Sequence, residues 1–255
     1  MSKEVFFEVD LNTPLGPIRG RVSVNTGPMG LVELVPTALE LTNMLVDRAR
    51  KREEREGKRI SCQAGCGTCC CQMVPISAPE AFYLADLVES LPPDRREDLL
   101  ERFEVIKKEL ERQHLIDELL DPLYGDDGAM TTAKKYFFLN LPCPFLVNES
   151  CSIHPYRPVA CREYNVTSPP PWCADPYSYE VSKVPMPLPL SAPLASLTAQ
   201  LTDSKPRLIP LTLTPFWVVA NTSLRQRQWP GLELFQQFMA EIGKPWLQQS
   251  PPPDE

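Results

Sequence analysis

The nine cysteines of this 255-residue chain lie in two short stretches, and their thiols are the side chains best suited to chemistry. The first stretch, SCQAGCGTCCCQM (residues 61–73), holds five of them. The second holds Cys143, Cys151, Cys161 and Cys173. Thiolates are soft donors that bind zinc and iron–sulfur clusters, and four of them complete a tetrahedral zinc site. The two stretches therefore predict metal binding.

The spacing in the first stretch favours a compact turn around an ion. Cys62, Cys66 and Cys69 are separated by three and two residues, with Gly65 and Gly67 between them. Glycine tolerates positive φ, so the chain can turn tightly and direct amide N–H groups at sulfur. Because zinc–sulfur bonds are about 2.3 Å long, ligands of one ion must converge within a few ångströms.

Three consecutive cysteines are unlikely partners of one ion, because neighbouring side chains of an extended backbone point to opposite faces. Either two metal centres lie side by side, or at least one of the three thiols is a buried core residue. We expect Cys69 and Cys70 to be ligands and take Cys71 as the weakest candidate.

The second stretch has gaps of seven, nine and eleven residues between its cysteines. Zinc-finger pairs are usually two to four residues apart, so the long gaps favour a cage in which each thiol comes from a different turn. The prolines of this region stiffen those turns and reduce the entropy lost on ordering. The predicted metal ligands are the eight thiols Cys62, Cys66, Cys69, Cys70, Cys143, Cys151, Cys161 and Cys173.

Two arrangements of these thiols remain open. Eight can make two four-thiolate sites, or four can hold a [4Fe–4S] cluster while the rest bind a second metal or are structural. His154 is a further candidate ligand, although its place beside Pro155 favours packing or support of the ligands. Arg157 and Arg162 flank the cysteines and could offset the negative charge of a thiolate site.

Composition narrows the class of protein. The formal net charge is -7, and the one basic run, residues 48–59, is interleaved with Glu, which argues against nucleic-acid binding. The first residues carry no basic segment followed by an apolar one, and no apolar run approaches the ~20 residues of a membrane span. We therefore expect a cytoplasmic protein whose thiols stay reduced, which favours metal over disulfides.

The elements that must position the thiols are mostly helical, and we expect an α+β fold with a small N-terminal β-hairpin. Alternation of apolar and polar residues predicts two strands in residues 5–25. Ser77 and Glu80 form a capping-box pattern that starts a helix after the first cysteine stretch. Helices are expected at 36–58, from about 78, from Pro93 onward and at 230–247, loops or extended chain at 124–132, 136–146 and 182–197, and a strand within 207–223.

This organisation predicts three parts. Residues 1–34 form a hairpin extension, residues 35–180 a loop-rich metal-binding domain, and residues 181–255 a proline-rich arm and a helix that pack on the core. Within the last part, residues 184–215 could dock a protein partner.

The cysteine pattern, followed by "MVPISAPEAFYL", "CPFL", "CSIHPYRP" and "CREY", resembles the YkgJ-type cysteine-cluster family, described as a zinc- or iron-chelating domain. The resemblance covers residues 61–173. A related group is similar to flagellin lysine methylases, whose cysteine cluster is thought to hold an iron–sulfur centre. Cys71 and His154 depart from the family pattern.

The resemblance implies a zinc or iron–sulfur cofactor without naming a reaction. Three functions stay open. The protein binds metal in a structural or storage role, it is an iron–sulfur-dependent enzyme, or it is a protein-interaction module whose fold the metal stabilises. The sequence contains none of the common nucleotide-binding or hydrolase signatures that would identify an enzyme.

Overall fold

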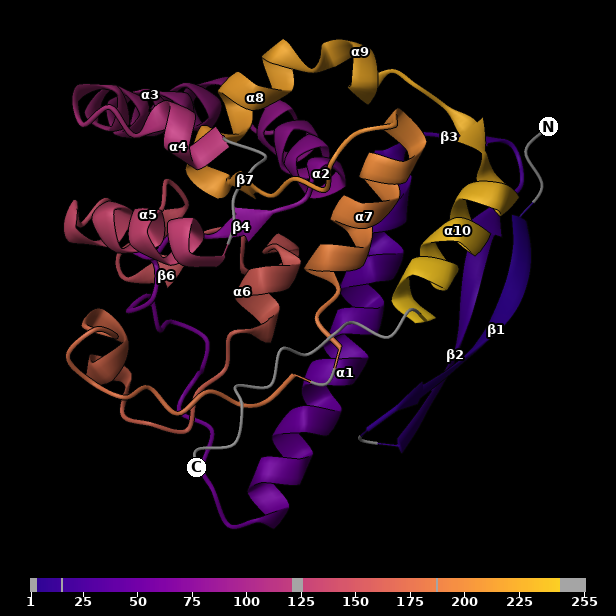
Figure 1. The fold of residues 1–255 in the computed structure, drawn as a ribbon, viewed down its shortest axis with the longest axis horizontal. Coiled ribbons are helices and arrows are strands. Elements are labelled where there is room, and N and C mark those ends of the chain that lie inside the picture. Colours follow the sequence, from indigo (N-terminus) through magenta and orange to yellow (C-terminus); the bar gives the residue numbers. More distant parts are fainter. Residues whose placement is uncertain (1–3, 15, 121–125, 187, 244–255) are drawn as a thin grey trace.

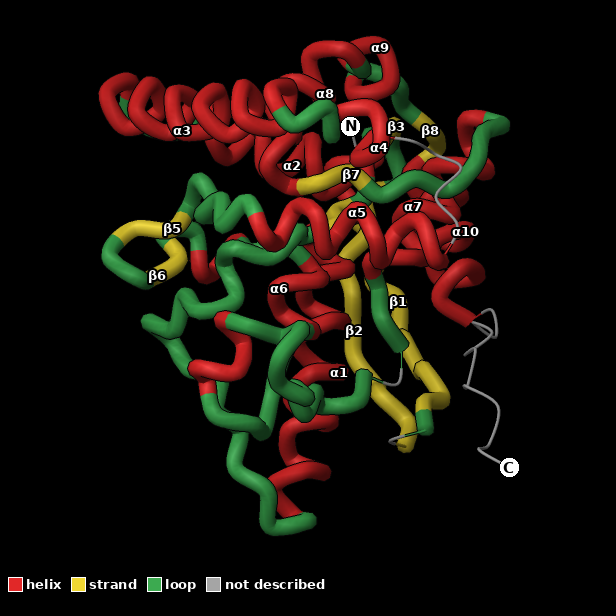
Figure 2. Tube along the Cα trace, turned by 60° about the vertical axis from the view of Figure 1, so that its left-hand side comes forward, coloured by secondary structure: helices red, strands yellow, loops and turns green. Residues whose placement is uncertain are grey.

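The structure, a computed structural model, describes residues 4–14, 16–120, 126–186 and 188–243. It is a helix-rich α+β protein with an N-terminal antiparallel hairpin (Figures 1 and 2). The strands are β1 (Glu4–Thr13), β2 (Gly16–Asn25), β3 (Pro28–Met29), β4 (Pro75–Ile76), β5 (Leu146–Val147), β6 (Ser150–Cys151), β7 (Ile209–Pro210) and β8 (Trp229–Pro230). The α-helices are α1 (Val35–Arg55), α2 (Ala78–Glu89), α3 (Pro93–Arg112), α4 (Ile116–Leu120), α5 (Asp126–Phe138), α6 (Val159–Glu163), α7 (Ser191–Thr202), α8 (Thr214–Ala220), α9 (Thr222–Arg225) and α10 (Gly231–Gly243).

The predicted hairpin is confirmed as β1 and β2, which pair from Glu4 opposite Asn25 to Thr13 opposite Gly16. One face of β2 is apolar, and its Ile18 and Val22 are buried. This face packs against α1 and α10, and the Phe7 ring lies 5.5 Å from that of Phe235. The hairpin is thereby held by helices, because a two-stranded sheet alone is only marginally stable.

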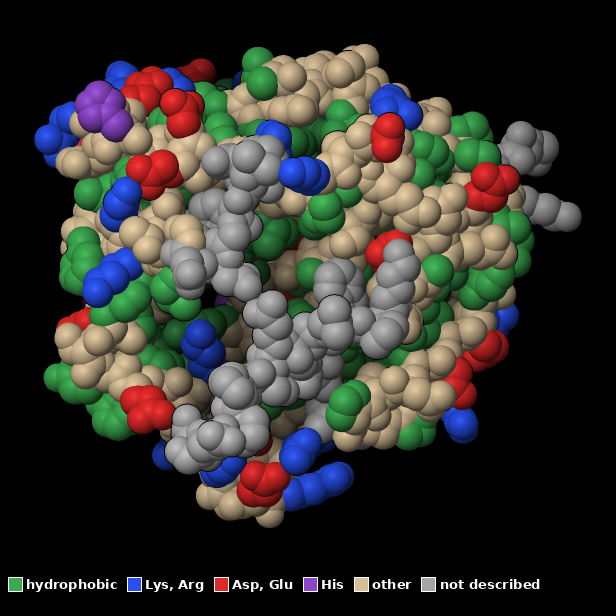
Figure 3. Space-filling model, in the orientation of Figure 1, with side chains coloured by type: hydrophobic (Ala, Val, Ile, Leu, Met, Phe, Trp, Pro, Cys, Tyr) green, Lys and Arg blue, Asp and Glu red, His purple; other side chains and the backbone are tan. Residues whose placement is uncertain are grey.

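Two of the predicted helices lead into and out of the first cysteine stretch. The apolar stripe of α1 is buried, and its last turns are charged. Figure 3 shows Lys, Arg, Asp and Glu side chains gathered at the end of the molecule where α1 ends, as expected of a solvated helix face. The capping box of α2 is present, with Ser77 N and Oγ donating to Glu80 Oε2 at 2.8 and 2.7 Å.

A short pairing joins the first cysteine stretch to the C-terminal third of the chain. Strand β4 follows that stretch directly and pairs with β7, with Ile76 opposite Ile209. The N–H of Leu211 extends the pairing by donating to the carbonyl of Val74 at 2.9 Å. The main hydrophobic core runs from the hairpin through α1 and α2 to α10, and a smaller cluster of Ile106, Leu110, Leu115, Leu119, Tyr136 and Leu213 lies beside α3.

The prediction of a loop at residues 124–132 was wrong where the structure describes it, because α5 begins at Asp126. Residues 124 and 125 lie outside the described residues. The prediction of a buried extended segment at 136–146 was also wrong at its start, where Tyr136 and Phe138 belong to α5 and Phe138 is exposed. Burial of Tyr136 in the smaller cluster outweighs the weak helix propensity of Gly128 and its threonine neighbours.

The prediction that residues 182–197 are extended holds for the first part and is wrong from Ser191 on, where α7 begins. Pro193 lies in the first turn of α7, where its missing N–H would have no partner within the helix. The two-residue β7 lies within the region predicted to hold a strand, and α10 covers the described part of the last predicted helix. Across the described ranges, no helix combines the length and the apolar character needed to cross a membrane.

Candidate metal centre

Backbone hydrogen bonds bring the two cysteine stretches together. The N–H of Cys143 donates to the carbonyl of Cys70 at 2.7 Å, and the N–H of Ser61 donates to that of Val166 at 2.9 Å. Strands β5 and β6 turn back sharply, which pairs Cys151 with Leu146. The first stretch therefore lies directly on the turns that carry the second.

Gly67 marks a close approach between the two stretches. A Cβ atom at this position would lie 2.5 Å from Leu146 Cδ1 and 2.6 Å from the carbonyl oxygen of Glu149. A side chain of any size would push the stretches apart. Gly65 has a different role, because its φ of 86° lies in the left-handed region and its Cβ would meet open space.

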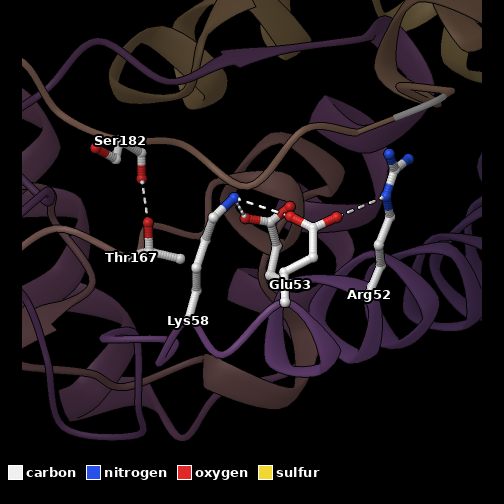
Figure 4. A network of polar contacts seen from close by, with 6 residues as sticks. Arg52, Glu53, Lys58, Thr167 and Ser182 are labelled. Atoms are coloured by element: carbon white, nitrogen blue, oxygen red, sulfur yellow. Dashed lines mark hydrogen bonds and ion pairs between the residues drawn. The ribbon is translucent and has the colours of Figure 1, made fainter.

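Polar contacts fix the two segments that enter the region (Figure 4). Lys58, just after α1, pairs with the buried carboxylate of Glu53 at 2.8 Å and with Glu56 at 3.1 Å. On the neighbouring segment, Thr167 donates from its backbone N–H to the carbonyl of Ser182 at 2.9 Å and from its hydroxyl at 3.4 Å. These contacts hold the chain just before Ser61 and just after Val166.

Five of the predicted ligands line one cavity of about 130 Å³. They come from both stretches and are Cys62, Cys66, Cys69, Cys161 and Cys173. His154, Arg157, Tyr164 and Arg50 complete the wall nearest to them. The sulfur of Cys62 accepts a hydrogen bond from the N–H of Val166 at 3.3 Å, which is the kind of donor that stabilises a thiolate.

Cys69 interacts electrostatically with thiols of both stretches. Its hydrogen bond with Cys70 and its burial raise the pKa of the Cys69 thiol far above the ordinary value. Negative charge on Cys69 would also raise the pKa of Cys143, Cys151 and Cys161, each of which is raised mainly by burial. Thiols from both stretches are therefore close enough to interact electrostatically.

Burial raises the pKa of several other thiols of the two stretches. Burial raises the pKa of Cys161 to about 12, and burial followed by the charge of Cys69 raises that of Cys173 to about 11. Burial likewise raises the pKa of Cys143. Ionising several buried thiols together needs a compensating positive charge, and a bound cation deprotonates a coordinating thiol.

The remaining thiols do not line the cavity but interact with Cys69. Cys143 and Cys151 are not on the cavity wall, although they interact with Cys69. Burial, and then the charge of Cys69, raises the pKa of Cys71. Negative charge on Cys71 would in turn raise the pKa of Tyr136. All nine cysteines are free thiols. In the described ranges, no three His, Cys, Asp or Glu side chains are already arranged to hold one ion.

Two arginines near the cysteines have different environments. Arg162 is mostly buried, and its donors are engaged by Asn43 Oδ1 at 2.7 Å and by the carbonyls of Arg157 and Pro155. These bonds tie α6 to α1 and the preceding turn. Arg157 lies on the cavity wall, and its buried Nε has no hydrogen-bond partner among the described residues.

Glu80 and Glu163 support the second stretch in ways that spacing alone did not predict. Glu80, besides capping α2, accepts a hydrogen bond from the N–H of Val159 at 2.9 Å and so fixes the start of α6. Glu163 accepts from the N–H of Leu190 at 2.7 Å, and burial raises its pKa to about 8. The capping-box pattern in the sequence pointed to Glu80, whereas no sequence pattern pointed to Glu163.

The comparison with family models matches residues 61–180 to the CxxCxxCC family, described as "Putative zinc- or iron-chelating domain". Residues 61–180 of this chain are therefore similar to that family. The match covers every cysteine of both stretches, so the expected resemblance is confirmed. Comparisons with curated proteins and with solved structures gave no match.

Proposed function

We propose that this protein binds zinc or an iron–sulfur cluster through thiols supplied jointly by its two cysteine stretches. The observation that carries the proposal is the shared cavity, where Cys62, Cys66 and Cys69 face Cys161 and Cys173. The family description supports zinc or iron as the cargo. A cytoplasmic location would keep the thiols reduced and available to the metal.

The donor set fits a soft cation. Thiols are the ligands that zinc and iron–sulfur clusters share, and several thiolates around one ion leave a net negative charge. Arg157 supports this fit, because its unpartnered Nε lies buried beside the cavity. Burial and two nearby arginines lower the pKa of His154, which favours the neutral imidazole that binds metals.

The candidate metal ligands are ranked by whether each thiol lines the cavity. The five on the cavity wall are the first choice. Cys143, Cys151 and Cys70 come second, because they do not line the cavity but interact with Cys69. Both arrangements, two four-thiolate sites or one [4Fe–4S] cluster with a second metal or structural thiols, use this set. Cys71 stays outside it, and His154 stays a supporting candidate.

Metal analysis of two variants tests the proposal. We expect Cys143→Ser to lose at least half of the bound metal and to lower the melting temperature, because structural metal binding contributes directly to folding. Cys71→Ser is the matched control and should keep the full metal content. Zinc and iron are measured per chain in anaerobically purified protein, and the visible spectrum separates zinc from an iron–sulfur centre.

Full metal content and an unchanged melting temperature in Cys143→Ser would refute the proposed role of that ligand. Metal-free wild-type protein, after growth with zinc or iron and anaerobic purification, would refute the proposed function as a whole.

A second candidate function, a metal-dependent enzyme, is favoured by another cavity that shares two of these thiols. Cys69 and Cys161 also line a space of about 450 Å³, together with Met73, Glu163 and Met186 among others. A largely apolar space of this size next to the proposed ligands could admit a substrate. A structural or storage site has no need of such an opening.

The interaction-module alternative has less support. Much of the proline-rich arm, residues 184–215, is already covered by the chain itself, with Val184, Leu194 and Ile209 buried. A protein partner would have to use the exposed part of the arm, around residues 203–208.

A further inference from the structure

A second large cavity lies away from the cysteines, among α7, α8, α9, the start of α2 and the segment before β7. Its volume is about 490 Å³, and it shares no lining residue with the two cavities beside the cysteines. Figure 1 shows α7 passing beside α2, with α8 and α9 along the same end of the molecule. A cavity of this volume falls within the usual range of small-molecule sites.

The lining of this cavity is basic in an acidic protein. Lys205, Arg207 and Arg227 line it, and none of the described Asp or Glu residues does. None of the three cations forms an ion pair within the described part of the chain. The nearby Arg225 is different, because it pairs with Asp86 and with Glu89 at 2.9 Å. The described residues therefore leave the positive charge at the cavity without a neutralising partner.

One of these cations has an internal role. The C-terminal end of a helix carries negative partial charge, and Arg227 serves the end of α7 by donating from Nη2 to the carbonyl of Leu201 at 3.5 Å. The Arg227 guanidinium also lies 5.1 Å from the centre of the Trp229 ring. Lys205 and Arg207 have no hydrogen bond or ring contact of this kind in the described structure, so their charges remain available at the rim.

The rest of the wall combines an apolar floor with hydroxyl groups. Ala195 and Ala199 of α7 and the ring of Trp217 of α8 form part of the floor. The hydroxyls of Thr202 and Ser204 lie 2.8 Å apart on the same wall. Apolar surface suits the body of a ligand, whereas hydroxyl groups and cations at the rim suit its charged end.

We propose that this cavity binds a small organic anion, with its phosphate, carboxylate or sulfonate group at Lys205 and Arg207 and its apolar body against α7 and Trp217. Arginine forms bidentate hydrogen bonds with planar or tetrahedral oxyanions, and lysine adds a point charge. The site stands on residues other than the proposed metal ligands and does not depend on metal binding.

The probe is anilinonaphthalene sulfonate, which joins an apolar body to one anionic group and becomes fluorescent on transfer from water. We expect saturable binding to the full chain, with Kd raised about tenfold or more in the double variant Lys205→Gln/Arg207→Gln, since each removed charge-assisted contact weakens binding. The control, Arg19→Gln/Arg96→Gln, removes the same charge at one exposed and one half-buried position outside the cavity lining. Inorganic phosphate and citrate are added as competitors.

Selective loss of affinity in the first double variant, with wild-type affinity in the control, supports the proposal. Competition by phosphate or by citrate then distinguishes which oxyanion the site prefers. Equal affinity in wild type and both variants, or no saturable binding at all, overturns it. A circular dichroism spectrum equal to that of the wild type verifies that each variant is folded.

Discussion

The close approach at Gly67 leads to a quantitative prediction for Gly67→Ala. The added Cβ would lie 2.6 Å from the carbonyl oxygen of Glu149, whereas ordinary contact begins at 3.4 Å, so the two stretches must separate by about 0.8 Å. The nearby carbonyl of Glu149 is backbone and cannot rotate away as a side chain would. Overpacking of this kind costs typically about 1–3 kcal/mol.

The same separation bears on metal binding, because ligand distances tolerate only about 0.2 Å. Gly67→Ala should therefore lower both the free energy of unfolding and the metal content per chain. Both are measured on anaerobically purified protein, by urea unfolding and by elemental analysis. Gly65→Ala is the matched control, since its Cβ meets no atom within 4 Å and its cost of about 1–2 kcal/mol comes from backbone conformation alone.

The two variants separate steric contact from local strain. We expect Gly65→Ala to keep more metal than Gly67→Ala even where their stabilities are similar. If Gly67→Ala bound as much metal as the wild type and unfolded at the same urea concentration, the inferred contact between the two cysteine stretches would be refuted.

Two further predictions concern acidic side chains that join distant elements. Glu80→Ala removes three hydrogen bonds made by Ser77 and Val159, so the free energy of unfolding should fall by about 3 kcal/mol in urea unfolding, and an unchanged value would contradict the role of this carboxylate. Arg225→Gln breaks the link from α9 to Glu89 on α2, and at pH 7 it should cost about 0.5–1 kcal/mol. The hydrogen bond from Arg225 lowers the pKa of Glu89, so this stabilisation is present above the ordinary Glu pKa and is lost as pH falls through the lowered folded value. The difference between wild type and variant should shrink in unfolding curves measured at pH 3, and a constant difference would contradict the assignment.

The fold was predictable from the sequence wherever local signals agreed with tertiary packing. Alternation in the hairpin, the apolar stripe of α1 and the Ser77–Glu80 pair each led to the observed element. The local signals did not predict α5 and α7, because Gly128 and Pro193 are residue types that disfavour helices. Both helices form because neighbouring residues are buried, which local propensity does not record.

The candidate site was predictable in its residue types and only partly in its geometry. Spacing singled out the cysteines as candidates and the family match spans all of them, while their role as ligands stays a prediction. Spacing did not reveal which of the thiols line one cavity, because that depends on the packing of residues far apart in sequence. The orphan Nε of Arg157 and the buried Glu163 likewise follow from tertiary structure.

The bond from Val166 to Cys62 joins residues 104 positions apart. A ribosome adds roughly 5–20 residues per second, so roughly 5–20 s pass between the synthesis of the two partners. During that interval the five thiols of residues 61–73 have emerged without the turns that later enclose them. Metal delivery and protection from oxidants during translation therefore bear on the yield of correctly assembled protein, independently of the stability of the finished fold.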